Sequence, residues 1–343
     1  MGASAGVVPA IVVLADARVR MVLPLGIRRS KGVRVLEFLG GTVTDYNAPL
    51  ADPAFAASLD ASSVQALWTR IGAVLPPHDI VRLVRMPASL DAPGGAGEAQ
   101  VPNPLVHLPG ASAAGLARSV ALPDSYAALA ASLRRKFRQD TIRCRRLLEN
   151  EGSVRLLVAD DDATMRTVIA AVKPMKSRRW TDTGSRDWFA NADFADFYDA
   201  MGGMTLPEGR VHGSALTVGD TLVAAHLGLV YRDRFYLLLV GWKSDGWQRF
   251  STGRLIIDAL MQATIDDGLR VFDFTVGDEA YKREWVDTEL PLFACERAVG
   301  ARGHWVLTAT ALIDRLRARA KRVAWLRGAV RRLAGRPRLP GRK

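Results

Sequence analysis

The sequence predicts a mixed α/β chain of two domains, each a mixed, mostly antiparallel sheet flanked by helices. With 343 residues, the chain is about twice the usual length of one domain. Its content of 49% hydrophobic and 24% charged residues is typical of globular proteins. The strongest strand signals form a meander, which favours a mostly antiparallel sheet over a regular alternation of strands and helices.

The first region, residues 1–118, is predicted to be one domain. A helix is expected at 54–74, with Asp52-Pro53 as its cap and first position. The segment 87–115 is dense in Pro, Gly and Ala, which indicates a loop or linker and places a boundary near residue 118. Runs rich in Val, Ile and Leu predict strands at 7–14, 19–25, 33–39 and 80–86.

The second region, residues 119–305, is predicted to be another domain. After Pro123, a long helical pattern runs through Glu151 and carries seven basic residues, and a further helix is expected at 163–174. The helix at 253–267 ends before Gly268. Strands are expected at 154–158, 214–218, 221–231, 235–242 and 271–275.

The order of these elements also predicts a site. A meander that feeds one helix and one further strand builds a sheet in which two neighbouring strands run parallel and splay apart. The N-terminus of the helix at 253–267 then lies beside the splay. Its free amides and its dipole suit an anion such as a pyrophosphate.

The positive charge is concentrated at the C-terminal end. The net charge is +12, while residues 312–343 hold 12 Arg or Lys and the single Asp314, a net of +11. Within 306–343, apolar residues recur at intervals of three or four and predict a basic amphipathic helix. Two interpretations are open: the helix docks on the second domain, or it lies on an anionic inner leaflet. A specific nucleic acid partner is not expected, because Trp325 alone offers a stacking surface there.

No transmembrane segment, signal peptide or metal site is expected. The longest uncharged stretch, 99–117, contains polar residues and three prolines. The N-terminal apolar run lacks preceding basic residues. Cys144 and Cys295 cannot form a disulfide framework or a Cys-rich zinc site, and no His-x-x-x-His or carboxylate cluster is present. We expect a cytoplasmic protein, peripheral to the inner membrane if the basic helix binds lipid.

Several motifs together resemble a known family. Ser251-Thr252-Gly253 precede the helix, Phe272-Asp273-Phe274 follow it, and Gly277-Asp278-Glu279-Ala280-Tyr281-Lys282 come next, before Trp285. This series resembles the C-terminal signature of GNAT-type acyltransferases grouped with the cellulose-biosynthesis protein CelD. The resemblance covers residues 20–300. Further matching pieces are the Arg-rich helix at 133–151, the run 176–179, the strands around Ala224-Ala225-His226, and the stretch from Phe38 to Tyr46.

The resemblance implies two GNAT-like domains in tandem, as in the FemABX aminoacyltransferases, and acyl transfer from a thioester or ester donor to an amine or hydroxyl. An acyl-CoA donor, a glycan-precursor or other small-molecule acceptor, and a role in exopolysaccharide or cell-envelope synthesis are implied with it. The usual GNAT pyrophosphate loop is matched only at Arg249 and Gly253, with one residue too many between them. An aminoacyl-tRNA donor and a non-catalytic accessory role therefore remain as alternatives.

Acyl transfer needs a base, donors for the oxyanion and an acid for the leaving group. Tyr281 is a candidate acid for a departing thiolate, and Lys282 a fixed positive charge for a phosphate or the oxyanion. Asp273 alternates with Phe272 and Phe274 and is expected to point toward the cleft or into a hydrogen-bonded turn. His226 is a candidate base, or else a buried core residue. The non-catalytic alternatives are a structural phenol at Tyr281 and a surface ion pair of Lys282 with Asp278 or Glu279.

The remaining candidates are expected to bind the donor or the acceptor. The loop that enters the helix at 253–267 is the predicted donor-phosphate site, or else an ordinary helix cap. The acceptor pocket is expected between the two domains. The donor-site candidates are Arg249, Ser251, Thr252, Gly253 and Arg254, and the acceptor-site candidates are Asp45, Tyr46, Arg178, Arg179 and Asp278.

Overall fold

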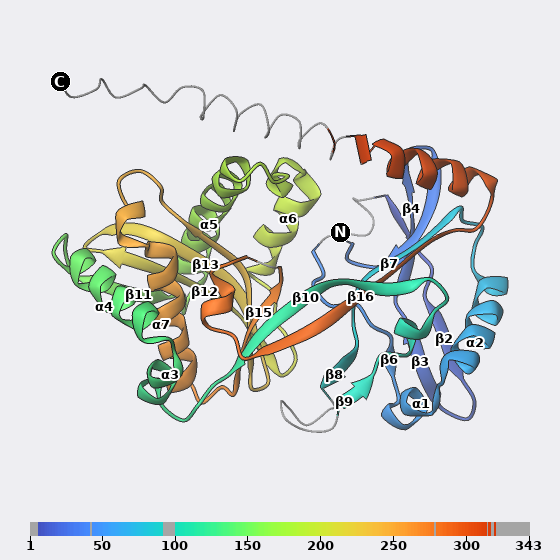
Figure 1. Cartoon of the computed structure of the whole chain (residues 1–343), viewed down its shortest axis with the longest axis horizontal. Helices are drawn as coiled ribbons and strands as arrows, with labels where there is room; N and C mark the ends of the chain where they lie inside the picture. Colours follow the sequence, from blue (N-terminus) through green and yellow to red (C-terminus); the bar gives the residue numbers. More distant parts are fainter. Residues whose placement is uncertain are drawn as a thin grey trace, which may run out of the picture.

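The computed structural model describes residues 6–41, 43–91, 100–277, 279–313, 315, 316 and 319. It has two lobes connected by two long antiparallel strands, β10 (Ala111–Ala121) and β16 (Thr288–Ala298) (Figure 1). One mixed sheet of 11 strands runs through both lobes in the order β1-β4-β5-β7-β16-β10-β15-β14-β13-β12-β11. This architecture confirms the predicted fold class. The predicted boundary near residue 118 falls inside β10.

The first lobe precedes β10 in the chain. Its sheet carries α2 packed through Val64, Trp68 and Ile71 against the strands. Its elements are β1 (Val7–Pro9), β2 (Val12–Ala15), β3 (Val19–Leu23), β4 (Leu25–Ser30), β5 (Val33–Phe38), β6 (Leu50–Ala51), α1 (Pro53–Ser58), α2 (Ala61–Val74), β7 (Ile80–Pro87), β8 (Ser89–Asp91), β9 (Gln100–Pro102) and the 3₁₀ turn η1 (Pro104–His107).

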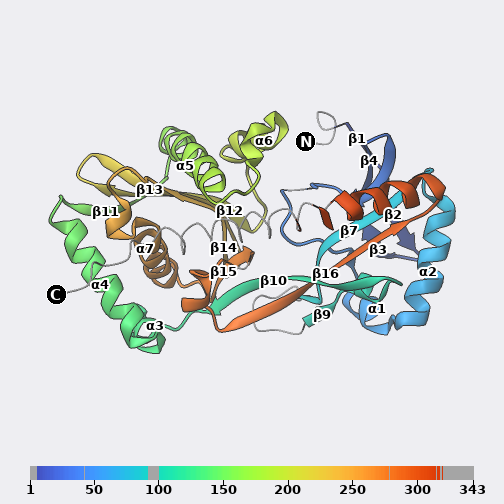
Figure 2. The same ribbon diagram turned by 45° about the horizontal axis from the view of Figure 1, so that its top comes forward.

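The second lobe lies between β10 and β16 in the chain. Figure 2 shows α5 and α6 on one face of its sheet and α3, α4 and α7 on the other. Its elements are α3 (Tyr126–Ser132), α4 (Arg135–Glu149), β11 (Val154–Val158), α5 (Asp162–Asp182), η2 (Trp188–Ala190), α6 (Ala192–Met201), β12 (Gly209–Val218), β13 (Thr221–Tyr231), β14 (Arg234–Trp242), η3 (Gln248–Phe250), α7 (Thr252–Asp266), β15 (Val271–Val276) and η4 (Lys282–Glu284).

The same strand–helix–strand unit occurs once in each lobe. In the first lobe, β5 and β7 are parallel neighbours and α2 connects them. In the second lobe, β14 and β15 are parallel neighbours and α7 connects them. Only two residue pairs join β5 to β7, and only three join β14 to β15, so each pair splays apart after a short contact. The splay predicted from the sequence is therefore present, and it is present twice.

The lobes exchange their inner strands. The strand that follows the first unit, β10, pairs with β15 of the second unit. The strand that follows the second unit, β16, pairs with β7 of the first. The strand that follows the first unit in the sequence thus pairs with the second unit, and the strand that follows the second unit pairs with the first.

Several predicted elements have different bounds in the structure. The helix predicted at 54–74 is two helices, since Leu59 is extended and Asp60 caps α2 by accepting from the Ser63 amide. The long Arg-rich helix is likewise interrupted at Leu133 and Arg134, which have extended backbone. The apolar stripe alone predicted continuous helices. The structure interrupts them where residues adopt an extended backbone and where a side chain caps the next helix.

Other elements were missed or cut short. Helix α5 continues through Pro174 to Asp182, because its backbone packs closely on Gly241 of β14 and tertiary contact compensates for the lost amide. The predicted loop at 87–115 contains β8, β9, η1 and the start of β10. Strand β16 and helix α6 carried weak signals, since Pro291 and several charged residues interrupt the first and a short length limits the second.

The predicted C-terminal helix is described only at its beginning. Residues 301–313, 315, 316 and 319 are helical, and the rest of 306–343 lies outside the described residues. Within the described ranges, no helix combines the length and apolar character needed to cross a bilayer.

Candidate functional site

The splay between β14 and β15 opens into two cavities. One, here called the helix cavity, has a volume of about 280 Å³ and lies at the N-terminus of α7. The other, the interlobe cavity, has a volume of about 200 Å³ and combines side chains of both lobes. Tyr281 lines both cavities, so its side chain stands where the two meet.

The helix cavity is suited to an anionic group. Ser251, at the N-cap of α7, has a left-handed φ of 54° and its side chain makes no capping hydrogen bond. The amides of a helix's first turn lack partners within the helix, so they are available to a ligand. The buried Thr252 hydroxyl has no hydrogen-bond partner among the described residues. The guanidinium groups of Arg179 and Arg254 also line this cavity.

Close packing keeps the helix cavity narrow at α7. A Cβ atom on Gly253 would lie 2.5 Å from the Trp242 ring, so a side chain at this position would displace the indole. The Arg179 guanidinium stacks 4.2 Å from the Trp242 ring centroid, and the Arg254 guanidinium 4.7 Å from that of Phe137. Four of the five predicted donor-site residues, Ser251 to Arg254, therefore line one cavity.

Arg249 is the exception in the predicted donor loop. Its guanidinium pairs with Glu151 at 3.1 Å and stacks over Phe250. It does not line the helix cavity. The extra residue in this loop, noted in the sequence, thus coincides with an arginine that faces the end of α4 instead of the donor site.

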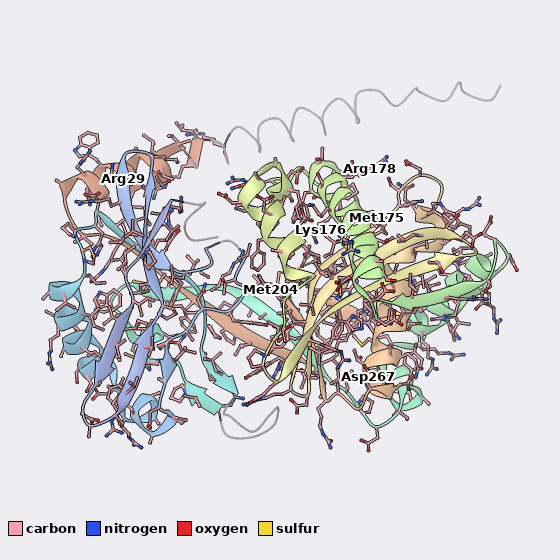
Figure 3. All side chains as sticks on the ribbon, turned by 180° about the vertical axis from the view of Figure 1, so that it is seen from behind. Arg29, Met175, Lys176, Arg178, Met204 and Asp267 are labelled. Atoms are coloured by element: carbon pink, nitrogen blue, oxygen red, sulfur yellow. The ribbon has the colours of Figure 1, made fainter. Side chains whose placement is uncertain are left out.

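The interlobe cavity is lined by charged groups and by aromatic rings. Asp45 of the first lobe pairs with Arg85 at 3.0 Å. Burial raises the pKa of Asp45, and the Arg85 charge opposes this rise. Lys176 on α5 faces the same cavity, and Figure 3 shows it on the same helix as Arg178. The aromatic side chains that line it are Trp180, Trp188, Phe194, Tyr198, Phe274 and Tyr281.

Lys176 is an amine with an unusual protonation equilibrium. Burial, assisted by the neighbouring cations Arg179 and Lys282, lowers its pKa to about 8, while Glu279 and Asp45 oppose the shift. Its ammonium lies 5.4 Å from the centroid of the Trp180 ring. About a tenth of Lys176 is therefore a neutral amine at pH 7, able to accept a proton.

Lys282 is a buried cation that lines the interlobe cavity. Its Nζ donates to the carbonyls of Phe274 and Val276, both at 2.9 Å, and pairs with Glu279 at 2.9 Å. The predicted ion pair with Glu279 exists, but Lys282 is only 3% exposed, so the pair is not a surface feature. These three acceptors occupy the ammonium, which ties the loop after β15 to the strand end.

Tyr281 has the properties of a proton donor. Burial raises the pKa of its phenol, and the nearby Glu279 carboxylate raises it further. The phenol therefore stays protonated at neutral pH. Its position between the cavities is where a leaving group from one side would meet a nucleophile from the other.

Asp273 and Tyr46 form a buried link between the lobes. The Tyr46 hydroxyl donates to Asp273 at 2.8 Å, the Arg234 guanidinium donates at 3.2 Å, and the amide of Thr275 donates at 2.7 Å. The last bond holds Thr275 at a φ of 56°, a strained value for a β-branched residue. Burial raises the pKa of Asp273, and these donors oppose the rise. Asp273 was expected to face the cleft and Tyr46 the acceptor pocket, but neither lines the interlobe cavity or the helix cavity.

His226 lies apart from these residues. It is fully buried on β13, with its Nδ1 3.3 Å from the Ser214 hydroxyl and its ring stacked on Phe235. Burial holds its pKa well below the usual range. It lines neither the helix cavity nor the interlobe cavity. Its surroundings match the core interpretation given with the sequence.

The remaining predicted site residues divide in the same way. Arg179 lines the helix cavity, whereas the exposed Arg178 pairs with Asp245 at 2.9 Å. Asp278 lies outside the described residues. Within the described residues, no group of three or more His, Cys, Asp or Glu side chains lies together as a metal site would require.

Sequence reasoning missed several cavity residues. Lys176 was noted only as part of a polar run, and Arg85 lies in a segment that simply indicates a strand. The sequence does not distinguish Arg85 from its neighbours in β7. Its left-handed φ of 57° is seen only in the structure. The aromatic residues of 188–198 formed a readable cluster that no predicted element had claimed.

Comparison with known proteins agrees with this geometry. The family model described as "Acetyltransferase (GNAT) domain" matches residues 135–283, from the start of α4 to η4. Among solved structures, FemX is similar with a TM-score of 0.55 and 10% identity, over 85% of this chain and 89% of that chain. This similarity shows a shared fold across both lobes. A search of curated protein sequences gives no match.

Two other solved structures are also similar. The C-terminal domain of a putative lysylphosphatidylglycerol synthetase from Agrobacterium fabrum has a TM-score of 0.49 and 11% identity, over 88% of each chain. A tandem GNAT protein from the clavulanic acid biosynthesis pathway has a TM-score of 0.41 and 10% identity, over 85% of each chain. Residues 135–283 thus match the model of an acetyltransferase (GNAT) domain, the domain of an acyl-transferring enzyme.

Proposed function

We propose that this enzyme transfers an acyl group from a donor held in the helix cavity to a small amine acceptor held in the interlobe cavity. The observation that carries the proposal is the position of Tyr281, which lines both cavities at the splay of β14 and β15. A donor and an acceptor that enter from opposite sides would meet at this phenol. The proposed acceptor class is an amine because carboxylates and aromatic rings both line its cavity.

Acyl-CoA is the donor that the helix cavity favours. Its pyrophosphate would accept from the free amides at the start of α7 and from the unpartnered Thr252 hydroxyl. Arg179 and Arg254 would neutralise its charge. The thioester would then extend along the splay toward Tyr281. The cavity chemistry thus supports the donor expected from the sequence.

The chemical step needs one proton transfer at each end. The amine attacks the thioester carbonyl, a carbon–nitrogen bond forms, and the carbon–sulfur bond breaks. In this proposal, neutral Lys176 accepts the proton that the amine loses, and Tyr281 donates a proton to the departing thiolate. The overall reaction moves one proton from amine to thiol and consumes no further reactant.

An aminoacyl-tRNA donor is the second candidate. Arg249 pairs with Glu151 outside the helix cavity, so the usual pyrophosphate loop of GNAT proteins is incomplete here. This favours a donor other than acyl-CoA. The exposed basic side chains of α4, such as Arg135, Lys136 and Arg146, would contact a longer polyanion. The resemblance of residues 251–285 to CelD-grouped proteins supports a biological role in exopolysaccharide or cell-envelope synthesis.

Calorimetric titration of the full chain with acetyl-CoA tests the donor. We expect binding that the substitution Thr252→Val weakens about tenfold, because the isosteric side chain removes only the unpartnered hydroxyl. Arg178→Gln is the matched control, since this arginine lies outside the cavity. Absence of heat with wild-type protein at millimolar acetyl-CoA would eliminate the acyl-CoA donor.

Tyr281→Phe then tests the acid role by thiol release from acetyl-CoA against a collection of primary amines. The variant keeps the ring packing and removes only the hydroxyl. We expect thiol release to fall about 100-fold, the size of a general acid contribution, with unchanged acetyl-CoA affinity. An unchanged rate would end this assignment.

A further inference from the structure

The helix at residues 301–313, 315, 316 and 319, here called the C-terminal helix, has one face docked on the first lobe. In Figure 1 it lies across the top of that lobe, after β16. Gly303 makes the closest approach, since a Cβ there would lie 1.9 Å from the Asp79 carbonyl oxygen. Val306 and Leu307 pack against Val33, Val35 and Ile80 of the sheet. This inner face attaches the described start of the helix to the first lobe, whereas the docking interpretation from the sequence placed it on the second domain.

The opposite face of the C-terminal helix is also apolar. Trp305 is 77% exposed, Leu312 57% and Leu316 58%. Their spacing of seven and four residues places them on one side of a helix, away from Gly303 and Val306. Since the inner face already attaches the helix, folding does not explain a second apolar stripe. Exposed apolar side chains arranged in line indicate a binding surface.

The charge around this stripe indicates what it binds. Arg315 and Arg319 are exposed beside the stripe on the same helix. The sequence from 312 to 343 carries a net charge of +11, from 12 Arg or Lys and one Asp. Trp305, Leu312 and Leu316 lie on the same helix as the exposed Arg315 and Arg319, and this combination matches the boundary between anionic headgroups and acyl chains.

We propose that the stripe of Trp305, Leu312 and Leu316 docks this enzyme on an anionic lipid bilayer. The proposal does not depend on the acyl-transfer reaction. A second copy of the chain is a poorer occupant, because two segments of the same high positive charge would repel each other. RNA is also a poorer occupant, since two leucines offer neither hydrogen bonds nor stacking to bases.

Vesicle co-sedimentation of the full chain tests the proposal. We expect the wild-type protein to bind phosphatidylcholine vesicles that contain phosphatidylglycerol, to bind pure phosphatidylcholine far less, and to dissociate as salt is raised. The triple variant Trp305→Ser, Leu312→Ser, Leu316→Ser should lose roughly 30-fold or more of the partition coefficient, from lost apolar contact alone.

A matched control uses three exposed apolar residues of the same lobe outside this helix. Val8, Leu50 and Val74 are 64%, 71% and 73% exposed, and their combined replacement by serine should leave vesicle binding unchanged. Circular dichroism of both triple variants checks that they fold. Quenching by brominated lipid, compared between the wild type and Trp305→Phe, reports whether this indole enters the bilayer.

Three outcomes would overturn the proposal. The first is no binding of the wild type to anionic vesicles. The second is equal binding by the wild type and the folded triple variant, which would assign lipid affinity to other basic residues. The third is a wild-type dimer in size-exclusion chromatography that the triple variant abolishes, which would assign the stripe to a second copy.

Discussion

The two splayed strand pairs of this protein have the same topology, but the gap in the first is filled by protein and the gap in the second opens into cavities. Beyond the last pair of β5 and β7, the first splay is closed by the chain itself. The Asn47 side chain donates to the Val84 carbonyl at 2.9 Å, and the Asn47 amide donates to the Arg85 carbonyl at 2.9 Å. Asn47 therefore takes the hydrogen bonds that a continuing strand would have made. The second splay is lined by two cavities instead.

The helices that connect the splayed strands, α2 and α7, also differ at their N-termini. The N-terminus of α2 is capped by the Asp60 carboxylate, which accepts from the Ser63 amide and would repel an anion. The N-terminus of α7 has no side-chain cap and borders the helix cavity. The comparison teaches that the fold supplies a potential site twice, and that a few side chains decide whether it is filled or available.

The largest expected effect comes from removing the cation that holds the second splay in shape. Lys282→Met leaves the carbonyls of Phe274 and Val276 and the Glu279 carboxylate without their donor. We expect a loss of about 3 kcal/mol in the free energy of unfolding. Urea denaturation measures it. The control Lys173→Met breaks a more exposed pair with Asp199 and should cost no more than about 1 kcal/mol.

The next largest effect is expected from alanine substitutions of glycine in the two equivalent helices, α7 and α2. Gly253→Ala places a methyl group against the Trp242 ring, so acetyl-CoA affinity should fall by at least roughly tenfold, or about 1.4 kcal/mol. Gly72→Ala on α2 meets no atom within 4 Å and should raise stability by up to about 1 kcal/mol without changing donor affinity. Equal affinity in all three proteins would show that α7 does not border the donor.

Opening the first splay should have a smaller effect. Asn47→Ala removes the side-chain bond to the Val84 carbonyl, which is expected to lower the free energy of unfolding by about 1–2 kcal/mol. Because Asn47 follows Asp45 and Tyr46, the acceptor affinity should weaken as well. Thermal unfolding and amine titration measure the two effects. A stability loss without any change in acceptor affinity would separate the first splay from the site.

The smallest effect concerns the pH dependence of acyl transfer. Because Lys176 has its pKa lowered to about 8, the neutral amine becomes more abundant as the pH rises, and the rate should rise through pH 8 and then level off. Lys176→Met should remove this inflection and leave donor affinity intact. Glu279, Lys282, Asp45 and Arg179 face the same amine, so an inflection that persists in the variant would assign it to another group.

The protonation of Lys176 also affects folding. A lysine with a lowered folded-state pKa opposes folding while it is protonated, so its effect on stability is most favourable above the unfolded pKa of about 10.4. That contribution is lost as the pH falls through 8. The stability difference between Lys176→Met and the wild type should therefore change between these two pH values, in the direction that favours the variant at low pH.

The predictable part of the fold was the part set by local pattern. The meander of β12 to β14, the helix α7 and the strand β15 have strong periodic signals, and their order implies the splay. The same reasoning placed Ser251 to Arg254 at a helix N-terminus, where four of these residues line a cavity. Tyr281 was recognised from a short motif that follows β15 directly.

The unpredictable part depended on contacts between distant segments. Asp45 and Lys176 meet in one cavity although more than a hundred residues separate them, and no local pattern encodes that meeting. The pairing of β7 with β16 is equally long-range, and β16 itself has a weak strand signal because Pro291 and several charged residues interrupt it. The bonds that tie Asp273 to Tyr46 and Arg234 likewise required the assembled sheet.

The exchange of β10 and β16 constrains how this chain is made. Strand β7 ends at Pro87, but its neighbour in the sheet ends at Ala298, 211 residues later. At a synthesis rate of about 5–20 residues per second, the first lobe waits roughly 10–40 s for its inner strand. During that interval β7 presents an unpaired edge, which is a template for aggregation. Dependence on a chaperone during synthesis is the expected consequence for heterologous expression.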